Sequence, residues 1–599
     1  MFADVFIKFK IMDKEILKSG EFLLKESTAE STFIIEEIDE EQQMIIQTCR
    51  DFIETEVFPN LDAIEDKKTG LTAQILSKSG ELGLLGISVP EEYEGFGQAF
   101  TTSMLASDEM GAGYSFSVAY SAHTGIGTMP IVYYGNDEQK QKYLPPLALG
   151  EQKAAYCLTE PTAGSDANSG KTKAVLSEDG KHYILNGTKM WITNGGFADV
   201  FTVFAKIDND RVLSAFIVES AWDGVEVQPE EKKMGIKGSS TTQIFFTDVK
   251  VPVENLLGKR GQGFRIALNI LHMGRIKLGA AVMGAARRTI SNSVAYANER
   301  KQFNQAISNF GAIQHKLAEQ VIRTFANESA VYRVSKNIDH VVEKMVADTG
   351  KEKGTITIEA IGFYALEAAA LKVYGSEMLD FVVDEGVQIH GGMGYSAETE
   401  IDKGYRDSRI NRIFEGTNEI NRIIVAEHAI NKSMKGIDLK TLVEEIKNED
   451  HSIDNSNYFK ARTQMNKNFK AVALLLIERL QDKFGRKFIQ EQEILSNIAD
   501  IITQTYITES TKLRVEKLEA LKPEMEYPVY MDILDTLMYD SANLIRTKAT
   551  TAIDSFLSGE ERNEYLNLIQ QLTLAVPVNT KEARRRIAAK LIEDNRYNF

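Results

Sequence analysis

A change of hydrophobic period between Lys153 and Val251 constrains the fold of this chain more than any other feature. Four short runs there are rich in β-branched and aromatic residues and are bounded by turn dipeptides such as Asp179-Gly180, a pattern typical of strands. On both sides of this region, apolar residues recur at helical spacing. The first helix is predicted to begin after Asp39, because Asp-Glu-Glu-Gln is typical of a helix cap and its partner at the third helical position. The sequence therefore predicts a small β domain inserted between helical domains. The four runs are 183–185, 200–204, 212–218 and 243–246.

The expected fold class is thus mainly α with an inserted β domain. A chain of 599 residues is too long for one core and indicates several structural units. A polar, acidic break at 448–457 is typical of a linker, and helical periodicity returns after it, with breaks expected at Pro523, Pro528 and Pro577. The predicted division is 1–35 N-terminal extension, 36–152 N-terminal helical domain, 153–258 middle β domain, 259–435 helical bundle domain, 436–457 linker and 458–599 C-terminal helical domain.

Charge and cysteine content exclude several function classes. Lys and Arg number 69 and Asp and Glu 86, a net charge of −17, which argues against a nucleic-acid partner. An anionic ligand would need a local basic pocket. Cys49 and Cys157 are too few for a disulfide framework, which indicates a reducing compartment. The eight His show no metal-ligand spacing, so no metal site is expected.

The ends of the chain suggest a cytoplasmic protein. The first twelve residues lack the apolar core and cleavage site of a signal peptide, and Met12 is an alternative start to Met1. No apolar run approaches the roughly 18 residues that span a bilayer. Peripheral membrane contact through the C-terminal domain is a hypothesis carried by 584–586, three arginines beside Ile587 and Leu591. The alternative is a solvated face, which the acidic balance of the chain favours.

One carboxylate, Glu415, lies on a Phe-Glu-Gly-Thr turn between two strongly patterned segments. With an aromatic ring on one side and a glycine on the other, it is a candidate buried base whose pKa is raised by desolvation. The simpler interpretation is a helix N-terminus in which Thr417 caps the helix from Asn418 to Ala429. Glu415 would then be an ordinary exposed acid.

Four further motifs each allow a structural and a functional interpretation. The segment 156–166 is rich in hydroxyls and glycine, which suits a polar heterocycle or a phosphate as well as a turn. Trp191 lies at the end of a strand, where it is either a core residue or a residue that lies beside a flat cofactor. Asn298–Phe303 is a charged helix end, which is either a solvated face or a site where the arginine binds a pyrophosphate. Gln388–Tyr395 is a glycine-rich loop, which either caps the C-terminus of a helix or lets the backbone approach a bound group closely.

Two nucleotide-binding motifs are ruled out. Five residues separate Gly164 from Gly170 where a phosphate-binding P-loop has four, and Gly-x-Gly-x-x-Gly occurs nowhere in the chain. No Rossmann-type site is therefore expected.

Taken in order, the five motifs resemble the acyl-CoA dehydrogenase family over residues ~40 to 430. They are Tyr-Cys-Leu-Thr-Glu-Pro, Trp-Ile-Thr-Asn-Gly, Arg-x-x-Phe, Gln-Ile-x-Gly-Gly-x-Gly and Phe-Glu-Gly-Thr-Asn. The segments 232–237, 270–275 and 309–314 and the C-terminal extension are most similar to the very-long-chain branch. The resemblance implies an N-terminal helical domain, a β-barrel-like middle domain and a four-helix bundle that together enclose FAD, with an added C-terminal helical domain.

The resemblance also implies a catalytic centre. Glu415 matches the glutamate that removes the α-proton of an acyl-CoA thioester while the β-hydrogen leaves as hydride to FAD. Phe414 and Gly416 match residues that shape the acyl slot. Arg275 matches an arginine near the substrate, and Ser165 matches a residue that faces the CoA moiety.

The cofactor contacts implied by the resemblance fall into three groups. One wall of the flavin site is formed by two segments of the β domain, the diphosphate is met by the start of a helix, and a third set reaches the FAD of a neighbouring subunit, which implies a homodimer. Asn418-Glu419 departs mildly from the family's commoner Asn-Asp. These groups are, in turn, Tyr156, Leu158, Thr159, Gly164, Ser165, Trp191, Ile192 and Thr193; Thr417, Asn418 and Glu419; and Arg300, Phe303, Gln314, Gln388, Ile389, His390, Gly391 and Gly392.

The implied function is α,β-dehydrogenation of fatty acyl-CoA to trans-2-enoyl-CoA in β-oxidation, with electrons passed to electron transfer flavoprotein. Ser117 and Ser121, at positions where medium-chain members carry long polar side chains, predict a deep tunnel and a preference for dodecanoyl or longer chains. An acyl-CoA oxidase that uses oxygen and an assembly or scaffold protein of the same fold are the alternatives. Retention of Glu415 favours an active enzyme.

Overall fold

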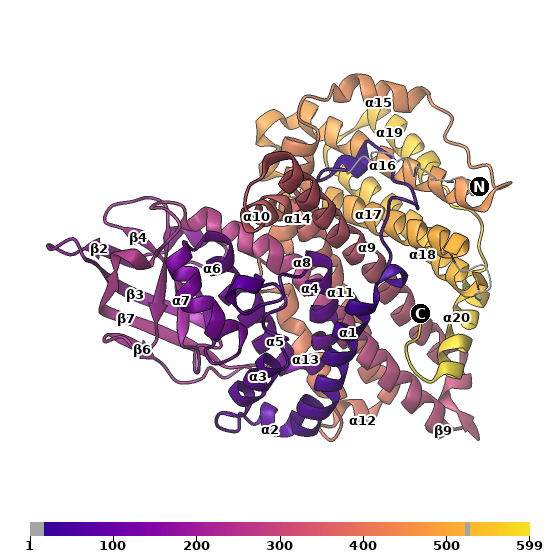
Figure 1. Cartoon of the computed structure of the whole chain (residues 1–599). Coiled ribbons are helices and arrows are strands. Elements are labelled where there is room, and N and C mark those ends of the chain that lie inside the picture. The colour runs from indigo at the N-terminus through magenta and orange to yellow at the C-terminus, as the bar shows by residue number, and fades with distance from the viewer. Residues whose placement is uncertain (1–16, 522–526) are drawn as a thin grey trace, which may run out of the picture.

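The computed structural model describes residues 17–521 and 527–599. The large sheet lies at one end of the molecule, and the C-terminal helices lie at the other end (Figure 1). The predicted class, mainly α with an inserted β domain, is confirmed. The two alternative starts, Met1 and Met12, and the break expected at Pro523 lie outside the described residues.

The N-terminal helical domain begins at a capped helix. Asp39 accepts a hydrogen bond from the backbone N–H of Gln42 at 2.8 Å, and the Gln42 side chain returns one to Asp39, so the predicted capping box is confirmed. Cys49 and Phe52 are buried on one face of this helix. The helices of this domain are α1 Glu40–Phe52, α2 Leu61–Glu65, α3 Leu71–Glu81, α4 Phe100–Met110, α5 Ser115–Ser121, the π-helical η7 Ala122–Gly127, α6 Met129–Tyr134 and α7 Asp137–Ala148.

All four predicted β runs fall in strands of the middle domain. The sheet runs in the order β6-β7-β3-β2-β4-β5-β8, and β1 pairs in parallel with β4. Strand β4 is buried almost throughout, as expected for a central strand. The strands are β1 Ala154–Cys157, β2 Lys173–Leu176, β3 His182–Thr193, β4 Val200–Ile207, β5 Ser214–Glu219, β6 Val225–Val227, β7 Thr241–Pro252 and β8 Leu256–Leu257.

The helical bundle is centred on α8, which packs against α9 and α11. A Cβ on Gly279 would already lie 3.4 Å from Val331 and 3.5 Å from Leu371, so a small residue lets these helices approach closely. Among the described helices, α8 alone is long and apolar enough to cross a membrane. However, 67% of its apolar 18-residue stretch is buried inside the fold, as expected for a core helix. The elements are α8 Gly263–Glu299, β9 Lys301–Gln302, β10 Gln305–Ala306, α9 Gly311–Thr349, α10 Lys353–Phe363, α11 Ala365–His390, α12 Gly392–Tyr395, α13 Ile401–Ser408 and α14 Asn418–His428.

The C-terminal domain includes a helix that the sequence analysis missed. The segment 436–457 was predicted to be a linker, but its first half forms α15, Leu439–Asn448, which is capped by Asp438 and buries Val443 and Ile446. Residues 436–438 and 449–457 lack regular structure, and the run of acidic and polar residues in 449–457 offers no apolar face to bury. The expected break at Pro577 separates the last two helices. The remaining helices are α16 Tyr458–Phe484, α17 Gln492–Leu521, α18 Tyr527–Phe556, α19 Gly559–Leu572 and α20 Thr580–Asp594.

Helix α20 does not present an apolar face to a membrane. Ile587 and Leu591 are fully buried, and α20 packs against α9 and α18. Arg584 pairs with Glu319 at 2.7 Å, and Arg586 pairs with Asp532. The apolar residues on which the membrane-facing hypothesis relied are therefore not available to a bilayer. Arg585 and Arg586 are exposed, as the alternative of a solvated face predicted.

Candidate active site

The turn that carries Glu415 is held in an unusual backbone conformation. Glu415 has φ +59° and Gly416 φ +84°, two successive left-handed residues, which is costly for a glutamate. The side-chain amide of Asn421 donates to the carbonyl of Gly416 at 2.8 Å and to that of Thr417 at 3.0 Å. Nε of Arg275 donates to the Glu415 carbonyl at 3.1 Å. These bonds fix the direction in which the Glu415 side chain leaves the backbone.

The carboxylate of Glu415 is enclosed. Its Oε2 atom is buried and has no hydrogen-bond partner among the described residues. A Cβ on Gly274 would lie 2.9 Å from that oxygen, so the absence of a side chain at 274 makes room for the carboxylate. Burial raises the pKa of Glu415 to about 7, and Arg275 and Lys372 limit the rise. A carboxylate in this state is suited to accept a proton near neutral pH.

The two interpretations of this motif are therefore each correct in part. Thr417 does cap α14, because its hydroxyl accepts from the backbone N–H of Ile420 at 3.3 Å, and the helix ends at His428. Glu415 is not the exposed acid that the simpler interpretation required.

Two buried cations lie near the Glu415 carboxylate. Arg275 is 3% exposed, and burial lowers its pKa while Glu415 opposes the change. Lys372 of α11 donates to Oδ1 of Asn418 at 2.7 Å, and burial lowers its pKa to about 7. Asn418 is therefore directed into the protein, so only its backbone is left to meet a diphosphate. Glu419 is exposed beside it.

The end of β1 and the end of β3 form one wall. The carbonyl of Thr159 accepts from the N–H of Met190 at 3.0 Å, and a buried ion pair of 2.7 Å between Lys189 and Glu160 ties the two segments together. Trp191 has φ +60° and is 54% exposed, so it is not a core residue. Of the predicted flavin contacts in this wall, Tyr156, Leu158 and Ile192 are buried, Thr159 and Thr193 are half-buried, and Gly164 and Ser165 are exposed.

These residues fit a flat, polar group such as the isoalloxazine and ribityl part of FAD. The exposed face of Trp191 offers a stacking surface. A Cβ on Gly164 would meet nothing within 4 Å, so ligand atoms can reach the backbone there. The buried hydroxyl of Tyr156 and Oε2 of Glu415 lack partners, and a bound polar group would supply them. Ile192 contributes only its backbone, because its side chain lies in the sheet core.

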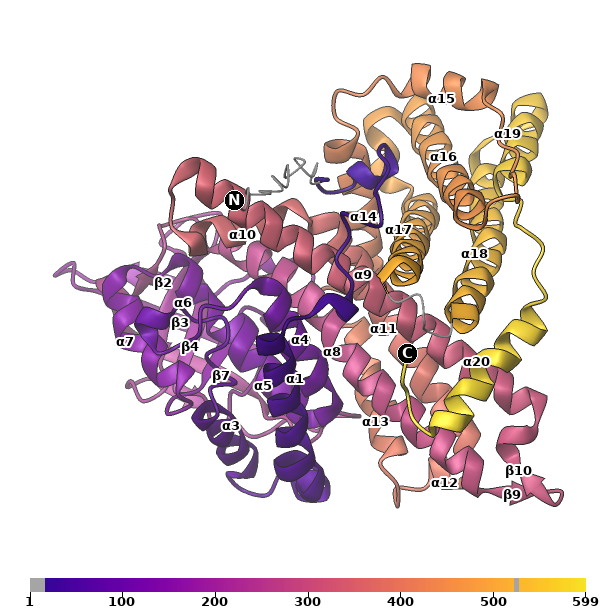
Figure 2. The ribbon, with the colours of Figure 1, turned by 45° about the vertical axis from the view of Figure 1, so that its right-hand side comes forward.

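The remaining predicted cofactor residues form a separate cluster at the far end of α8. Tyr296 stacks on His390 with ring centroids 4.3 Å apart, and Phe303 is 87% exposed in the β9–β10 hairpin. The positions of Arg275 and Arg300 on α8 differ by 25 residues, which at 1.5 Å per residue is about 37 Å. Figure 2 shows the β9–β10 hairpin and α12 together, away from the sheet. One chain does not bring this cluster, which includes Gln314 and Gln388–Gly392, to Glu415.

Sequence reasoning missed Gly274, Lys372, Asn421 and a further lysine. Lys277 is buried on α8, and the one hydrogen bond recorded for its ammonium goes to the Thr124 hydroxyl of η7 at 2.7 Å. Burial lowers the pKa of Lys277 to about 7. Lys277 and Lys372 each lie in a run of mainly small or apolar residues, and this pattern could have indicated from the sequence that both lysines are buried.

Comparison with known proteins places this geometry in a family. The N-terminal, middle and C-terminal domain models of acyl-CoA dehydrogenase match residues 39–151, 155–249 and 261–430. A further model, also described as an acyl-CoA dehydrogenase C-terminal domain, matches 468–571. The chain belongs to the acyl-CoA dehydrogenase family, and it is a flavin-dependent oxidoreductase whose cofactor is FAD.

Three relatives indicate how far the similarity extends. A probable acyl-CoA dehydrogenase of Bacillus subtilis is 42% identical over 588 residues, which is 97% of this chain and 99% of that protein. The crystal structure of an acyl-CoA dehydrogenase complexed with FAD from Bacillus anthracis matches with a TM-score of 0.94 and 44% identity, over 97% of this chain and 100% of that one. The human mitochondrial very long-chain specific enzyme is 43% identical over 58% of this chain, and the match spans only 51% of the human protein.

Proposed function

We propose that this chain dehydrogenates long-chain fatty acyl-CoA to trans-2-enoyl-CoA in β-oxidation and passes the electrons to electron transfer flavoprotein. The observation that carries the reaction type is Glu415, an enclosed carboxylate with one unpartnered oxygen and a pKa raised to about 7. A base of this kind can take the α-proton of a thioester without being solvated by water.

Each residue of the site has a role in this proposal. Glu415 holds the α-proton on Oε2, and Gly274 leaves the space that the Glu415 carboxylate occupies. Arg275 and Lys372 limit the rise of the Glu415 pKa, so that the ionised form of the base is still populated at neutral pH. FAD, when bound, accepts the β-hydrogen as hydride. Trp191 and the Thr159–Ser165 loop hold the flat ring in place, and the substrate itself excludes water from the slot.

The proposed active unit is a homodimer. The cluster at Arg300, Phe303 and Gln388–Gly392 is about 37 Å along α8 from Arg275, so it can serve a cofactor only on a second chain. Phe303 at 87% and Tyr395 at 89% exposure are apolar surfaces that a partner would cover. Sedimentation velocity of the holoprotein tests this. A monomer that retains full FAD and activity would contradict it.

The decisive experiment is an anaerobic titration of the holoprotein with palmitoyl-CoA, followed by the visible absorbance of the flavin. Bleaching with a long-wavelength charge-transfer band is expected. A coloured protein that does not bleach would overturn the substrate class. Fast oxygen consumption during aerobic turnover, in place of reduction of electron transfer flavoprotein, would indicate an oxidase.

Chain length needs a separate comparison. Ser117 is buried and Ser121 is half-buried, and both are small, which supports a deep tunnel. Rates with butyryl-, octanoyl- and palmitoyl-CoA should rise along that series. Higher activity with butyryl- or octanoyl-CoA than with palmitoyl-CoA would contradict the long-chain assignment.

A further inference from the structure

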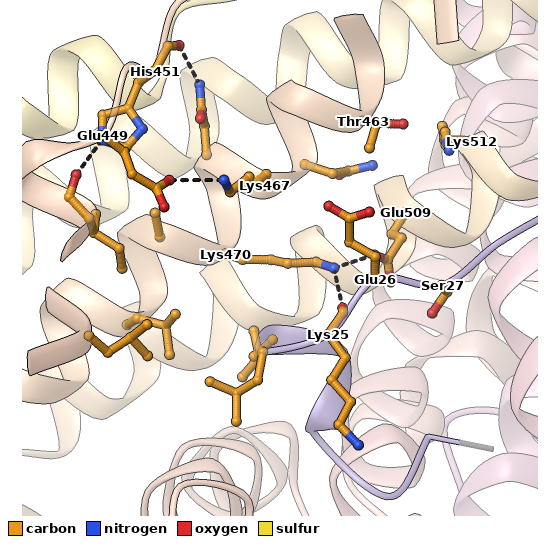
Figure 3. Close-up of a pocket in the computed structure, with 18 residues that line it drawn as sticks. Lys25, Glu26, Ser27, Glu449, His451, Thr463, Lys467, Lys470, Glu509 and Lys512 are labelled. Carbon is orange, nitrogen blue, oxygen red and sulfur yellow. Dashed lines mark hydrogen bonds and ion pairs between the residues drawn. The ribbon is translucent and has the colours of Figure 1, made fainter. Parts of the chain in front are cut away.

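A cavity of ≈ 160 Å³ lies away from the Glu415 site, where the N-terminal segment meets the C-terminal domain. Its walls come from 23–27, from α15 and the stretch after it, and from α16 and α17 (Figure 3). An apolar protein cavity of about 150 Å³ holds benzene, so the volume suits a ligand of about six non-hydrogen atoms. None of the lining residues belongs to the flavin or substrate site described above.

One wall of the cavity carries an unpartnered polar side chain. Asn466 is 3% exposed, and its Oδ1 accepts from the Thr508 hydroxyl at 2.7 Å. Its Nδ2 is buried and has no partner among the described residues. Turning the amide by 180° would only exchange which atom is left unpaired. Since a buried amide group without a partner destabilises the fold, a polar ligand group next to Asn466 would relieve that cost.

The same wall carries a buried ammonium group with one donor that has no acceptor among the described residues. Lys470 donates to the carbonyl of Lys25 at 3.0 Å and to Glu509 (Figure 3). Glu509 also pairs with Arg333 at 2.8 Å, so one carboxylate serves two buried cations. An ammonium group has three donors, and the described residues provide acceptors for two of those of Lys470. The third favours a negatively charged acceptor.

Other charges around the cavity are paired or exposed. Lys467 pairs with Glu449 at 2.9 Å at the exposed mouth, as Figure 3 shows, and Lys512 pairs with Glu516 at 2.6 Å. Glu26 is exposed. These groups do not supply the missing anion to the buried wall.

The opposite wall is apolar. Leu442 and Ile446 of α15 line it, and Ala471 and Leu474 of α16 add apolar surface next to Lys470. We propose that this cavity binds a short-chain monocarboxylate, with the carboxylate on Lys470 and Asn466 and the alkyl chain between α15 and α16. Because Lys470 also holds the backbone of Lys25, such a ligand fastens the N-terminal segment to the C-terminal domain. The proposal does not depend on the acyl-CoA reaction.

Thermal unfolding and isothermal titration of the FAD-loaded full chain with sodium butyrate test the proposal. Butyrate should raise the melting temperature saturably relative to equal sodium chloride, as a ligand of the native state does. Butyramide, which lacks the charge, and inorganic phosphate, which lacks the alkyl chain, should each bind at least tenfold more weakly. No saturable effect of butyrate would overturn the proposal. Equal binding of phosphate or butyramide would overturn the ligand class.

Variants locate the binding. Ala471→Leu fills the cavity with apolar atoms and should abolish the butyrate effect without lowering the melting temperature. An undiminished effect in this variant would place butyrate elsewhere and refute the site. Lys470→Met should weaken binding at least tenfold. The matched control is Lys467→Met, which removes the same charge from the same helix at a side chain that is 51% exposed and ion-paired at the mouth, and it should change the affinity less than threefold.

Discussion

Two buried glutamates in this molecule have opposite electrostatic surroundings. Glu415 has an oxygen with no partner, and burial raises its pKa to about 7. Glu509 is buried in the C-terminal domain, where burial alone would raise its pKa, but Arg333 and Lys470 hold it below its usual value. Burial is common to both, so the partners decide the outcome. The unpartnered carboxylate can exchange a proton, whereas the paired one is fixed as an anion that joins helices.

The largest effect is expected from Glu415→Gln, which keeps the shape and removes the base. Reduction of the flavin by palmitoyl-CoA should slow by at least ~10²–10⁴-fold, while FAD stays bound. Stability should not fall. A carboxylate whose pKa is raised above its unfolded value destabilises the fold as pH rises from about 4.5 to about 7, and glutamine lacks that cost. Stopped-flow absorbance measures the rate, and wild-type reduction in this variant would refute the role as base.

Glu509→Gln should act on stability. Removing the shared carboxylate leaves Arg333 and Lys470 buried without their anion, which should lower the free energy of unfolding by about 3–5 kcal/mol in urea. Because the Glu509 pKa is depressed, its contribution is present above about pH 4.5 and is lost as pH falls further. The control Glu516→Gln removes a half-buried partner of Lys512 from the same helix and should cost less than about 1 kcal/mol. Equal losses in the two variants would contradict the assignment.

Lys277 extends the comparison to a buried cation that forms no ion pair among the described residues. Its pKa falls to about 7, below its unfolded value, so the wild type should gain stability as pH rises from about 7 to about 10. Lys277→Met should stabilise the fold at pH 7 by on the order of 2 kcal/mol and remove that pH dependence. Urea unfolding at three pH values measures both. A less stable variant with an unchanged pH slope would show that the hydrogen bond to Thr124 matters more than desolvation.

Arg275→Met sharpens the Glu415 side of the comparison. Arg275 lowers the Glu415 pKa against the effect of burial, so its loss should move the pH of half-maximal flavin reduction up by about one unit. Arg275→Lys keeps the charge and should shift the profile less. An unshifted profile in the methionine variant would mean that Arg275 acts only through its hydrogen bond to the Glu415 carbonyl.

The sequence determined the class of fold and singled out Glu415 as the candidate base. Short β-type runs between helical stretches predicted the inserted β domain, because a period of two cannot be satisfied by a helix. The five motifs predicted the family, and Asp39 and Thr417 predicted helix starts, because capping depends on nearby residues alone. The predicted linker failed over 439–448, where α15 gains its stability by burying Val443 and Ile446 against neighbours that are distant in sequence.

The tertiary structure alone decided the state of each charged group. Glu415 is met by Gly274 and Arg275 of α8 and by Lys372 of α11, two helices that are distant from it in the chain. Its burial and the two cations set its pKa. Two arginines of α20, which suggested a membrane-facing surface, instead pair with Glu319 in the interior and with Asp532 at the surface. A residue type fixes what a side chain can do, but burial and partners, which only folding assembles, fix which of those things it does.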